Sequence, residues 1–483
     1  MQTKTTKTHG LRRWHRRFAW LALLAALCFA LTGALHPLMT RTQPRPAQFA
    51  PPPMPVLSMA LPAPGPLLLQ AGIDELSGLR LLHDGQRWLW RASAKEQSVR
   101  YLDALDGRLL PASTEAEHAE RLARWYSGDA QSPLVEARPQ TAFDADYAYV
   151  NRLLPAWRLQ LARPDGLAVY VATEDDRLAT LSDTRKRVFQ RLFQAVHSWA
   201  WLPAPLRNGW INLLLAGVAA ASLLGLSIAL RQSGGRRWNL RRLHRWGGLT
   251  VALAALAWAV SGYLQARGNA ERENEQAPQR PLRVASALLR ASVQAPVEVV
   301  SGLQLVTVDG APAWRWSLQP PVTTTGRGLA MGEHQHHGRA PQGAEGPALA
   351  LYVSAEDGQT LPGAVGRHLA ELAGYFGVAD PAAPATPVLA FSDDYGFLYK
   401  RLPVWRLEQA DAVHSAYYLD PASERLAARV DDDLRLVDSV FAYAHKWEWL
   451  TPWLGKDWRD SLTSVFTLLL IAVAIGGTLL RRR

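Results

Sequence analysis

Four long apolar runs constrain the fold of this chain more than any other feature. They predict membrane-spanning helices over residues 18–38, 207–230, 246–265 and 460–480. Each run is close to the ~20 apolar residues that cross the hydrocarbon core of a bilayer. One alternative is that the runs are helices buried in a soluble core, but their basic flanks are too regular for that. The other is that the first run is a cleaved signal peptide, for which it is long.

Basic residues at the ends of the runs predict the orientation. Lys and Arg are concentrated in residues 1–17, in the link 231–245 and in the tail 481–483. If all four runs span, these three segments lie on one side, which the positive-inside rule places in the cytoplasm. The formal net charge of +11 is therefore mainly a topology signal. We expect contact with membrane lipid and no nucleic-acid partner, because the charge lies at membrane edges and not on a soluble patch.

Two large segments, 67–200 and 266–448, then lie outside the cytoplasm, the first behind a proline-rich linker over residues 39–66. Alternating strand-like segments and Asp-Gly turns favour a small α+β domain in each. A helix is expected to enter near Asp183 and to lead to His197, with its copy running from Asp433 to His445. Prolines before the second and fourth spans are expected to break these helices. Both termini are then cytoplasmic, and both domains lie on the opposite, external side of the membrane.

The chain also repeats itself. His244 follows His15 by 229 positions, and Gly262 follows Gly33 by the same 229. His445 follows His197 by 248 positions. This predicts an internal duplication in which a span, an external domain and a second span occur twice. Both copies start on the same side, so a pseudo-two-fold axis along the membrane normal is expected.

Five histidines lie at the span ends, where such residues are costly and usually functional. His15 and His244 are expected at the cytoplasmic edge, and His36, His197 and His445 at the external edge. The pseudo-two-fold axis brings His15 opposite His244, and His197 opposite His445. Two imidazoles from facing helices are what six-coordinate haem iron requires. We therefore predict two b-type haems with bis-histidine ligation, one at each face; the alternative is that the histidines only tolerate the headgroup zone.

His36 stands outside this symmetry. The equivalent position in the second copy is Gln265. His36 is therefore either a bystander or a replacement for one of the external ligands.

A further histidine cluster occurs in one copy only. Trp316 follows Trp90 by 226 positions, whereas Tyr352 follows Tyr101 by 251, so the second copy has gained about 25 residues between these strands. The candidate metal ligands of the gained loop are His334, His336 and His337. A metal or ferric-ligand contact and a solvated glycine-rich loop are both consistent with this composition.

Several chemistries are excluded by what the sequence lacks. Its single cysteine, Cys28, rules out disulfides, thiolate metal sites and iron–sulfur clusters. It has no dinucleotide-binding glycine motif, no P-loop and no nucleophile elbow. We therefore expect no flavin or nicotinamide site in this chain, and no hydrolase.

The motif from Leu240 to Leu249, which contains His244-Arg245-Trp246-Gly247-Gly248, is followed by Ser261-Gly262 and is copied from Leu11 to Gly33. Together with the helices that end at His197 and His445, it resembles the PepSY-associated transmembrane family. The strand, Asp-Gly turn and strand of each external segment look like PepSY domains, and the likeness covers nearly the whole chain. The first copy departs from the motif, with Arg16-Arg17-Phe18 in place of Arg-Trp-Gly.

The resemblance implies an inner-membrane, haem-containing oxidoreductase that reduces a ferric siderophore or another ferric chelate in the periplasm. Its electrons would come from a cytoplasmic flavoprotein or from a quinol. The expected fold is a four-span α-helical bundle with two periplasmic α+β PepSY-like domains. Two other functions remain open: a non-catalytic PepSY protein that binds or regulates a periplasmic partner, and an iron-uptake transporter component without redox chemistry.

Overall fold

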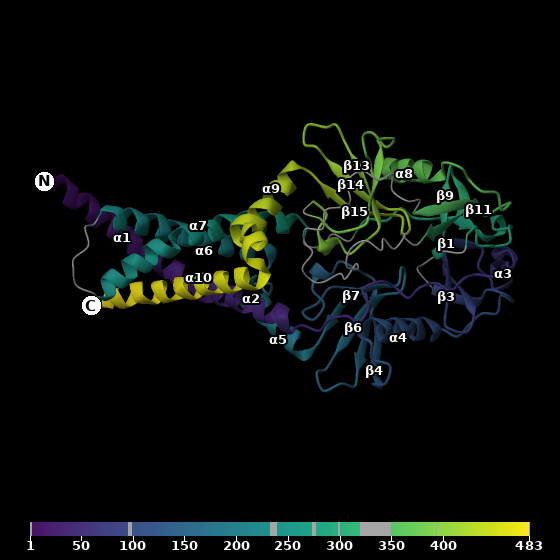
Figure 1. The fold of residues 1–483 in the computed structure, drawn as a ribbon, viewed down its shortest axis with the longest axis horizontal. Coiled ribbons are helices and arrows are strands. Elements are labelled where there is room, and N and C mark those ends of the chain that lie inside the picture. The colour runs from purple at the N-terminus through teal and green to yellow at the C-terminus, as the bar shows by residue number, and fades with distance from the viewer. Residues whose placement is uncertain are drawn as a thin grey trace.

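The computed structural model describes residues 2–94, 99–231, 239–272, 277–297, 300–318, 349–392 and 394–482. The molecule is elongated, with a bundle of long helices at one end and β-sheets at the other (Figure 1). We call the end of the bundle next to the sheets the lobe end, and the opposite end, where both chain termini lie, the terminal end.

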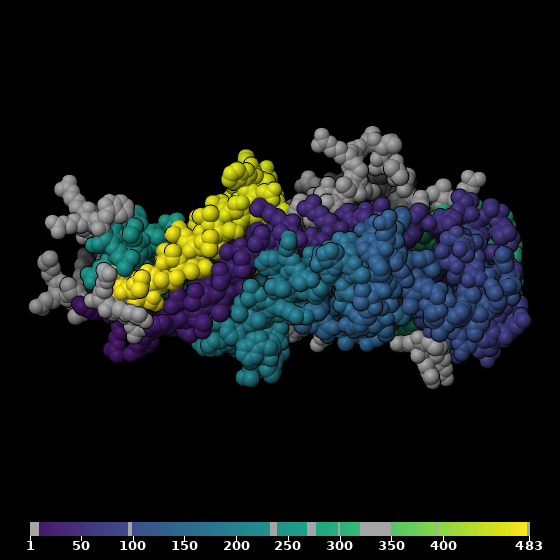
Figure 2. Space-filling view, turned by 90° about the horizontal axis from the view of Figure 1, so that it is seen from below, coloured from purple at the N-terminus to yellow at the C-terminus, as the bar shows by residue number. Residues whose placement is uncertain are grey.

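Four helical stretches are long and apolar enough to cross a membrane, which confirms that the four predicted apolar runs are long helices. They comprise α1 (Gln2–Ala25), which continues through a π-helical turn η1 (Ala26–Ala30) into α2 (Leu31–Thr42), then α6 (Ala204–Arg231), α7 (Leu240–Arg272) and α10 (Thr451–Arg482). Around the bundle, α1 packs on α6, α6 on α7, α7 on α10, and α10 on α2. Figure 2 shows the first helical stretch, from α1 to α2, side by side with α10 along the bundle. The bundle is therefore a closed ring of four helical stretches.

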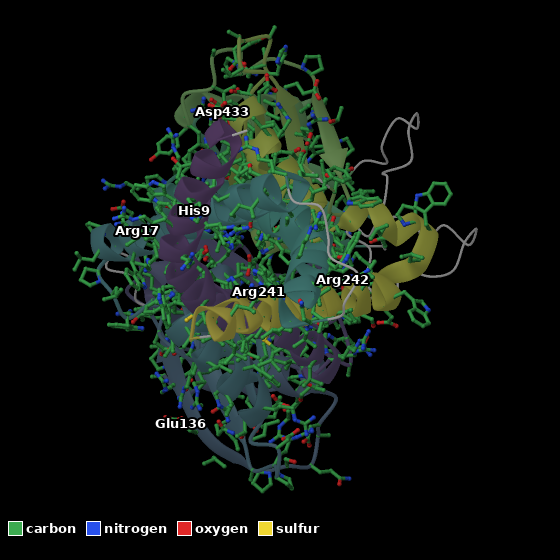
Figure 3. All side chains as sticks on the ribbon, turned by 90° about the vertical axis from the view of Figure 1, so that its left-hand side faces the viewer. His9, Arg17, Glu136, Arg241, Arg242 and Asp433 are labelled. Carbon is green, nitrogen blue, oxygen red and sulfur yellow. The ribbon has the colours of Figure 1, made fainter. Side chains whose placement is uncertain are left out.

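The basic segments gather at the terminal end of this ring. Figure 3 looks onto that end, where His9, Arg17, Arg241 and Arg242 lie around the helices. Glu136 and Asp433, which lie on the lobe side of the bundle, are near opposite margins of this view. All four helical stretches therefore run between the same two ends.

Three sheets form the rest of the molecule. The largest has the strand order β11-β10-β9-β1-β2-β3, with β8 paired to β1. Its strands are β1 (Glu75–His83), β2 (Trp88–Ala94), β3 (Val99–Asp103), β8 (Val284–Ala285), β9 (Val300–Val308), β10 (Ala311–Leu318) and β11 (Ala350–Ser354). The antiparallel pair β1–β9 joins the two halves of the chain, with Arg80 opposite Gln304. Both external segments therefore contribute strands to one sheet.

The strand register also corrects the predicted length of the gained loop. Arg91 faces Tyr101 across β2 and β3, and Arg315 faces Tyr352 across β10 and β11. Ten positions separate the first pair and 37 the second, so the gain is 27 residues. In this register Trp90 corresponds to Trp314 and not to Trp316.

Two four-stranded sheets form what we call the first and second lobes. The first lobe contains β4 (Leu134–Gln140), β5 (Ala156–Leu161), β6 (Ala168–Ala172) and β7 (Arg177–Ser182), in that order. The second contains β12 (Ala385–Val388), β13 (Val404–Glu408), β14 (Ala416–Asp420) and β15 (Arg425–Val430), in that order. Helix α4 (Thr114–Ser127) packs on the first lobe, and α8 (Ala364–Tyr375) packs between the large sheet and the second lobe. A short helix, α3 (Pro64–Gln70), lies at the far tip of the large sheet (Figure 1).

Each lobe is connected to the bundle by a short helix. Helix α5 (Thr184–Val196) follows β7, and α9 (Asp432–Val440) with the π-helical turn η6 (Phe441–His445) follows β15. The side chains of Asp183 and Asp431 cap them by accepting hydrogen bonds from the backbone N–H three residues later, at 2.7 and 2.9 Å. Carboxylates are favoured at this position because they satisfy free N–H groups at the positive end of the helix. The predicted entries of these helices are therefore correct to within about two residues.

The predicted cause of the helix breaks is wrong. Trp199 and Trp447, each two residues beyond a histidine, adopt left-handed backbone angles with φ of 52° and 57°. Left-handed geometry is uncommon for a residue with a bulky side chain, and it ends a helix. Pro452 instead lies in the first turn of α10, where its missing N–H costs nothing.

Candidate functional site

At the terminal end of the bundle, His15 on α1 and His244 on α7 face each other. Their ring centres are 6.3 Å apart, and the ring planes are inclined by 53°. His15 Nδ1 lies 3.0 Å from the carbonyl oxygen of Ala221, and His244 Nδ1 lies 3.0 Å from that of Val473. A carbonyl oxygen only accepts, so Nδ1 carries the proton in both rings. The Nε2 lone pair of each ring is then available to a metal ion.

Glycines make room for these two rings. A Cβ atom added to Gly225 on α6 would lie 3.1 Å from Cε1 of His15. One added to Gly477 on α10 would lie 2.9 Å from Cε1 of His244. Real Cβ atoms rarely approach so closely, so each ring lies directly against a helix backbone. Gly477 follows Gly225 by 252 positions, the same spacing as Ala221 and Val473.

The lobe end holds the second pair of histidines in a similar way. His197 Nδ1 lies 2.8 Å from the Thr32 hydroxyl oxygen on α2. That hydroxyl donates its own proton to the carbonyl oxygen of Cys28, 2.6 Å away. The threonine oxygen therefore accepts from the Nδ1–H of His197, which again leaves Nε2 free.

The contact recurs in the second half. His445 Nδ1 lies 3.0 Å from the Ser261 hydroxyl oxygen on α7, which donates to the carbonyl oxygen of Ala257 at 2.7 Å. Ser261 follows Thr32 by 229 positions, the spacing that separates His15 from His244. The indole N–H of Trp258 also donates to the backbone oxygen of His445, at 3.1 Å.

Aromatic rings hold these two imidazoles in orientation. Phe193 stacks on His197 with ring centres 4.1 Å apart, and Phe441 stacks on His445 at 4.6 Å. Each phenylalanine comes four residues before its histidine, so the two side chains lie on the same face of the helix. The ring of His197 also meets the edge of Phe29, with centres 5.3 Å apart.

The arrangement at the terminal end passes a geometric test for a shared metal. Two imidazole nitrogens at about 2 Å from one metal ion place the ring centres about 6 Å apart. The observed 6.3 Å between His15 and His244 agrees. The rings come from different helices of an apolar bundle, which is the setting that haem proteins use for axial ligands. His15 and His244 therefore fit a bis-histidine haem.

His36 lies beside the lobe-end pair. It is one helical turn beyond Thr32 on α2 and lines a small cavity with Thr32, Phe193 and four apolar residues, namely Leu35, Met39, Phe189 and Leu192. It is close enough to His197 and His445 to act electrostatically on both. On its other side it is near the charged residues Lys446, Lys456, Arg459 and Asp460 of the lobe end. This position keeps both predicted roles of His36 open.

The other predicted cluster, His334, His336 and His337, lies outside the described residues. Within the described part of the chain, no group of three or more His, Cys, Asp or Glu side chains is placed to hold a metal ion. The predicted haem sites need only two protein ligands each, so this finding does not bear on them.

Sequence reasoning missed the residues that orient the histidines. Thr32 and Ser261 share the 229-residue spacing, and Phe193 and Phe441 share the 248-residue spacing, so both pairs could have been found by extending the repeat. The carbonyl oxygens of Ala221 and Val473 could not, because any residue supplies a backbone oxygen. Their role is visible only in the packed helices.

The fold and site define a protein with four long apolar helical stretches, with His15 and His244 at the terminal end of the bundle and His197 and His445 on the short helices at its lobe end. Comparison of the chain with models of protein families, with curated proteins and with solved structures found no match. The function is therefore argued from the chain's own residues.

Proposed function

We propose that this chain is a di-haem electron-transfer protein of the bacterial inner membrane that reduces chelated ferric iron in the periplasm. The observation that carries the proposal is the recurring geometry of four histidines. Each has Nδ1 committed to a neighbouring oxygen, and one pair lies 6.3 Å apart between ring centres.

In this proposal His15 and His244 hold one haem at the terminal end, and His197 and His445 hold the second at the lobe end. A bound haem would supply a one-electron ferric/ferrous couple. The protein fixes the tautomer and orientation of each ring through Nδ1. Such supporting contacts make the ligand more basic and hold it ready to bind.

Two pairs are required because of the width of the membrane. His15 and His36 mark the two ends of the first helical stretch, and 21 residues of helix span about 31 Å. This is the thickness of the hydrocarbon core, so one haem cannot serve both faces. The lobes then lie in the periplasm, and the basic terminal end lies in the cytoplasm.

The same proposal includes the internal duplication and the likeness to PepSY domains. Equal spacings relate not only the histidines but also their partners: 229 for Thr32 and Ser261, and 252 for Gly225 and Gly477. A pairing of Arg80 with Gln304 at the centre of the shared sheet fits a pseudo-two-fold axis there. Electrons would enter from a cytoplasmic flavoprotein or a quinol, and one electron reduces each Fe(III) to Fe(II).

The test is the oxidation of the reduced protein by a ferric chelate. The purified protein is loaded with haem, reduced with dithionite and mixed with ferric chelate in a stopped-flow spectrometer, while ferrozine reports the Fe(II) formed. We expect the haem spectrum to return to the oxidised form as one Fe(II) appears per electron lost. The variant His197→Ala/His445→Ala should stay reduced on this time scale. Equal rates in both proteins, or a protein without haem, would reject the proposal and favour a binding or transport role.

A further inference from the structure

Two matching loops lie at the base of the lobes, one in each half of the molecule. Each contains a 3-10 turn, η3 (Tyr149–Asn151) or η5 (Phe397–Tyr399), followed by a basic residue with left-handed backbone angles. The residues are Arg152, with φ of 61°, and Lys400, with φ of 62°. This conformation is costly for residues other than glycine, so it persists only where the surroundings impose it. The fold therefore holds a basic side chain in the same unusual place in both halves.

These loops are fixed to the helices that carry the lobe-end histidines. Asp146 of the first loop forms an ion pair with Arg191 of α5 at 2.8 Å. Asp394 of the second loop lies 3.6 Å from Arg435 of α9. Figure 1 shows α5 and α9 running from the two lobes to the bundle. Arg191 precedes His197 by six residues, which is about 9 Å of helix, so the loops lie close to the lobe-end pair.

The two basic side chains face aromatic rings instead of carboxylates. The Arg152 guanidinium lies 5.6 Å from the ring centre of Tyr399, in the other half of the molecule, and its buried Nε has no hydrogen-bond partner. The Lys400 ammonium lies 3.7 Å from the ring centre of Phe397. Among the described residues, no carboxylate is paired with either group. Burial and the nearby Lys186 ammonium lower the pKa of Lys400 to about 7.

The carboxylates near Arg152 and Lys400 are already in ion pairs with other residues. Asp175 and Asp420 are both paired with Arg177 and with Arg401, over distances of 2.8 to 3.3 Å. Two acids thus neutralise two arginines, which leaves the charge of Arg152, and that of Lys400 when it is protonated, without a paired carboxylate among the described residues. A half-buried excess of positive charge is stabilised by an anion that enters the site.

The loops also expose apolar surface beside these charges. Phe397 is 48% exposed, Leu398 46% and Val150 41%. Cations next to exposed aromatic rings suit a ligand that is both anionic and aromatic, because its rings can stack while its charge is met.

We propose that Arg152, Lys400, Phe397 and Tyr399 form the binding site for an anionic ferric chelate of the tris-catecholate class. This rests on the proposed function and names the substrate class and its place on the protein. The bound Fe(III) accepts one electron from the reduced protein and becomes Fe(II). No covalent bond to the protein forms or breaks.

The test separates binding from electron transfer by using gallium, which takes the place of Fe(III) but is not reduced. Titration calorimetry in a zwitterionic detergent measures the binding of Ga(III) tris-catecholate, a trianion, to the purified full-length chain. We expect Arg152→Gln/Lys400→Gln to weaken binding by roughly tenfold or more, and Arg152→Lys/Lys400→Arg to keep most of it. Arg290→Gln removes an equal, exposed charge near the far tip and should change binding less than about twofold. A neutral Ga(III) tris-hydroxamate should bind weakly to all variants.

Equal binding of the trianion by the wild type and the glutamine variant would overturn the proposal. The proposal would also be overturned if phosphatidylglycerol in mixed micelles displaced the gallium chelate from these residues. That result would assign the site to an anionic lipid. Thermal unfolding of each variant shows whether it is folded, and the charge-preserving variant separates loss of charge from loss of fold. A protein that binds gallium chelate through these residues but reduces no ferric chelate would refute the proposed function and leave this site intact.

Discussion

At each of the four paired histidines, the nitrogen that faces the protein is already engaged. Two rings use backbone oxygens, and two use hydroxyls that are themselves fixed by donating to the preceding turn of their own helix. Supporting contacts of this type orient a metal ligand and select its tautomer. The Nδ1 contacts of these four histidines are therefore the clearest support for the proposed metal-binding role.

The hydroxyls of Thr32 and Ser261 are expected to act through their histidines. Thr32→Val and Ser261→Ala should each weaken retention of the lobe-end haem, by roughly 10- to 100-fold in affinity, because the Nδ1–H loses its acceptor. Haem-to-protein ratios after gel filtration, and redox titration of the haem that remains, check this. Thr250→Ala removes a hydroxyl that bonds only within α7 and should have no effect. Unchanged retention in both site variants would assign these hydroxyls a purely structural role.

Two adjacent glycines offer a matched pair of variants at the terminal end. Gly477→Ala places a methyl group 2.9 Å from Cε1 of His244, whereas Gly476→Ala places one 4.0 Å from Leu240. We expect Gly477→Ala to remove or distort the terminal-end haem and Gly476→Ala to be silent, as judged by absorbance spectra. The idea fails if both variants show the same spectrum as the wild type.

The sequence predicted the histidines themselves because they repeat at fixed spacing. It did not predict the partners Ala221 and Val473, since a carbonyl oxygen has no residue-type signature. It placed His36 at the same membrane edge as His197 and His445, but not its contact with the lobe-end pair, which depends on how α2 packs against α5. The repeat in the sequence therefore identified the candidate ligands, whereas the residues that orient them became visible only in the packed helices.

At the scale of elements, the two lobes are joined by a buried network of charges. Arg401 and Asp420 are almost fully buried, and Asp420 also accepts a hydrogen bond from Ser423 at 2.8 Å. Arg177 reaches across from the first lobe to Asp420 at 3.2 Å. Because the partners come from both halves, the network fixes the lobes relative to each other.

Breaking this network should be costly. Asp420→Asn leaves two buried guanidinium groups with less compensation, and loss of one partner of a buried ion pair costs about 3–5 kcal/mol. We expect the thermal unfolding midpoint, measured by tryptophan fluorescence, to fall by several degrees. Glu356→Gln breaks the exposed pair with Arg290 and should cost less than about 1 kcal/mol. Equal midpoints for the two variants would contradict the role given to Asp420.

The same residue predicts a pH dependence. Burial alone would raise the pKa of Asp420, but the facing Arg177 and Arg401 outweigh it and lower the pKa to about 2. A carboxyl group whose folded pKa is depressed stabilises the protein above its unfolded pKa, near 4. That stability is lost as the pH falls from about 4 towards 2. At each pH from 5 to 7 the unfolding midpoint of the wild type should therefore lie above that of Asp420→Asn, and the two midpoints should converge near pH 2. A difference between the two proteins that stays constant with pH would refute this.

Element boundaries were predictable where capping chemistry marks them, as at Asp183. The helix breaks were assigned to proline, but the left-handed residues are Trp199 and Trp447. Tryptophan carries no local signal for that conformation, so its cause is tertiary packing. Trp447 stacks on Trp258 of α7 with ring centres 5.5 Å apart, a contact between segments remote in the sequence.

At the scale of the whole molecule, four apolar helices were predictable from length and composition. The shared sheet was not, because β1 and β9 pair across 224 positions and nothing local specifies which edge strands meet. The consequence is that the two halves are joined: a ring of helices lies at one end, and at the other the large sheet takes strands from both halves and stands beside the two four-stranded sheets (Figure 1).

The proposed orientation can be tested with single cysteines. The background is Cys28→Ser. Arg290 is exposed and pairs with Glu356 just after β11 of the large sheet, whereas Arg241 lies at the terminal end (Figure 3). A membrane-impermeant maleimide added to spheroplasts should label Arg290→Cys and leave Arg241→Cys unlabelled until the membrane is broken. The reverse pattern would place the lobes in the cytoplasm.

The haem content of the purified chain tests the central claim most directly. The account predicts two low-spin haems per chain in the dithionite-reduced minus oxidised spectrum. One haem should be lost in His15→Ala/His244→Ala and the other in His197→Ala/His445→Ala. A chain that binds no haem, or one whose haem survives both pairs of substitutions, would contradict it.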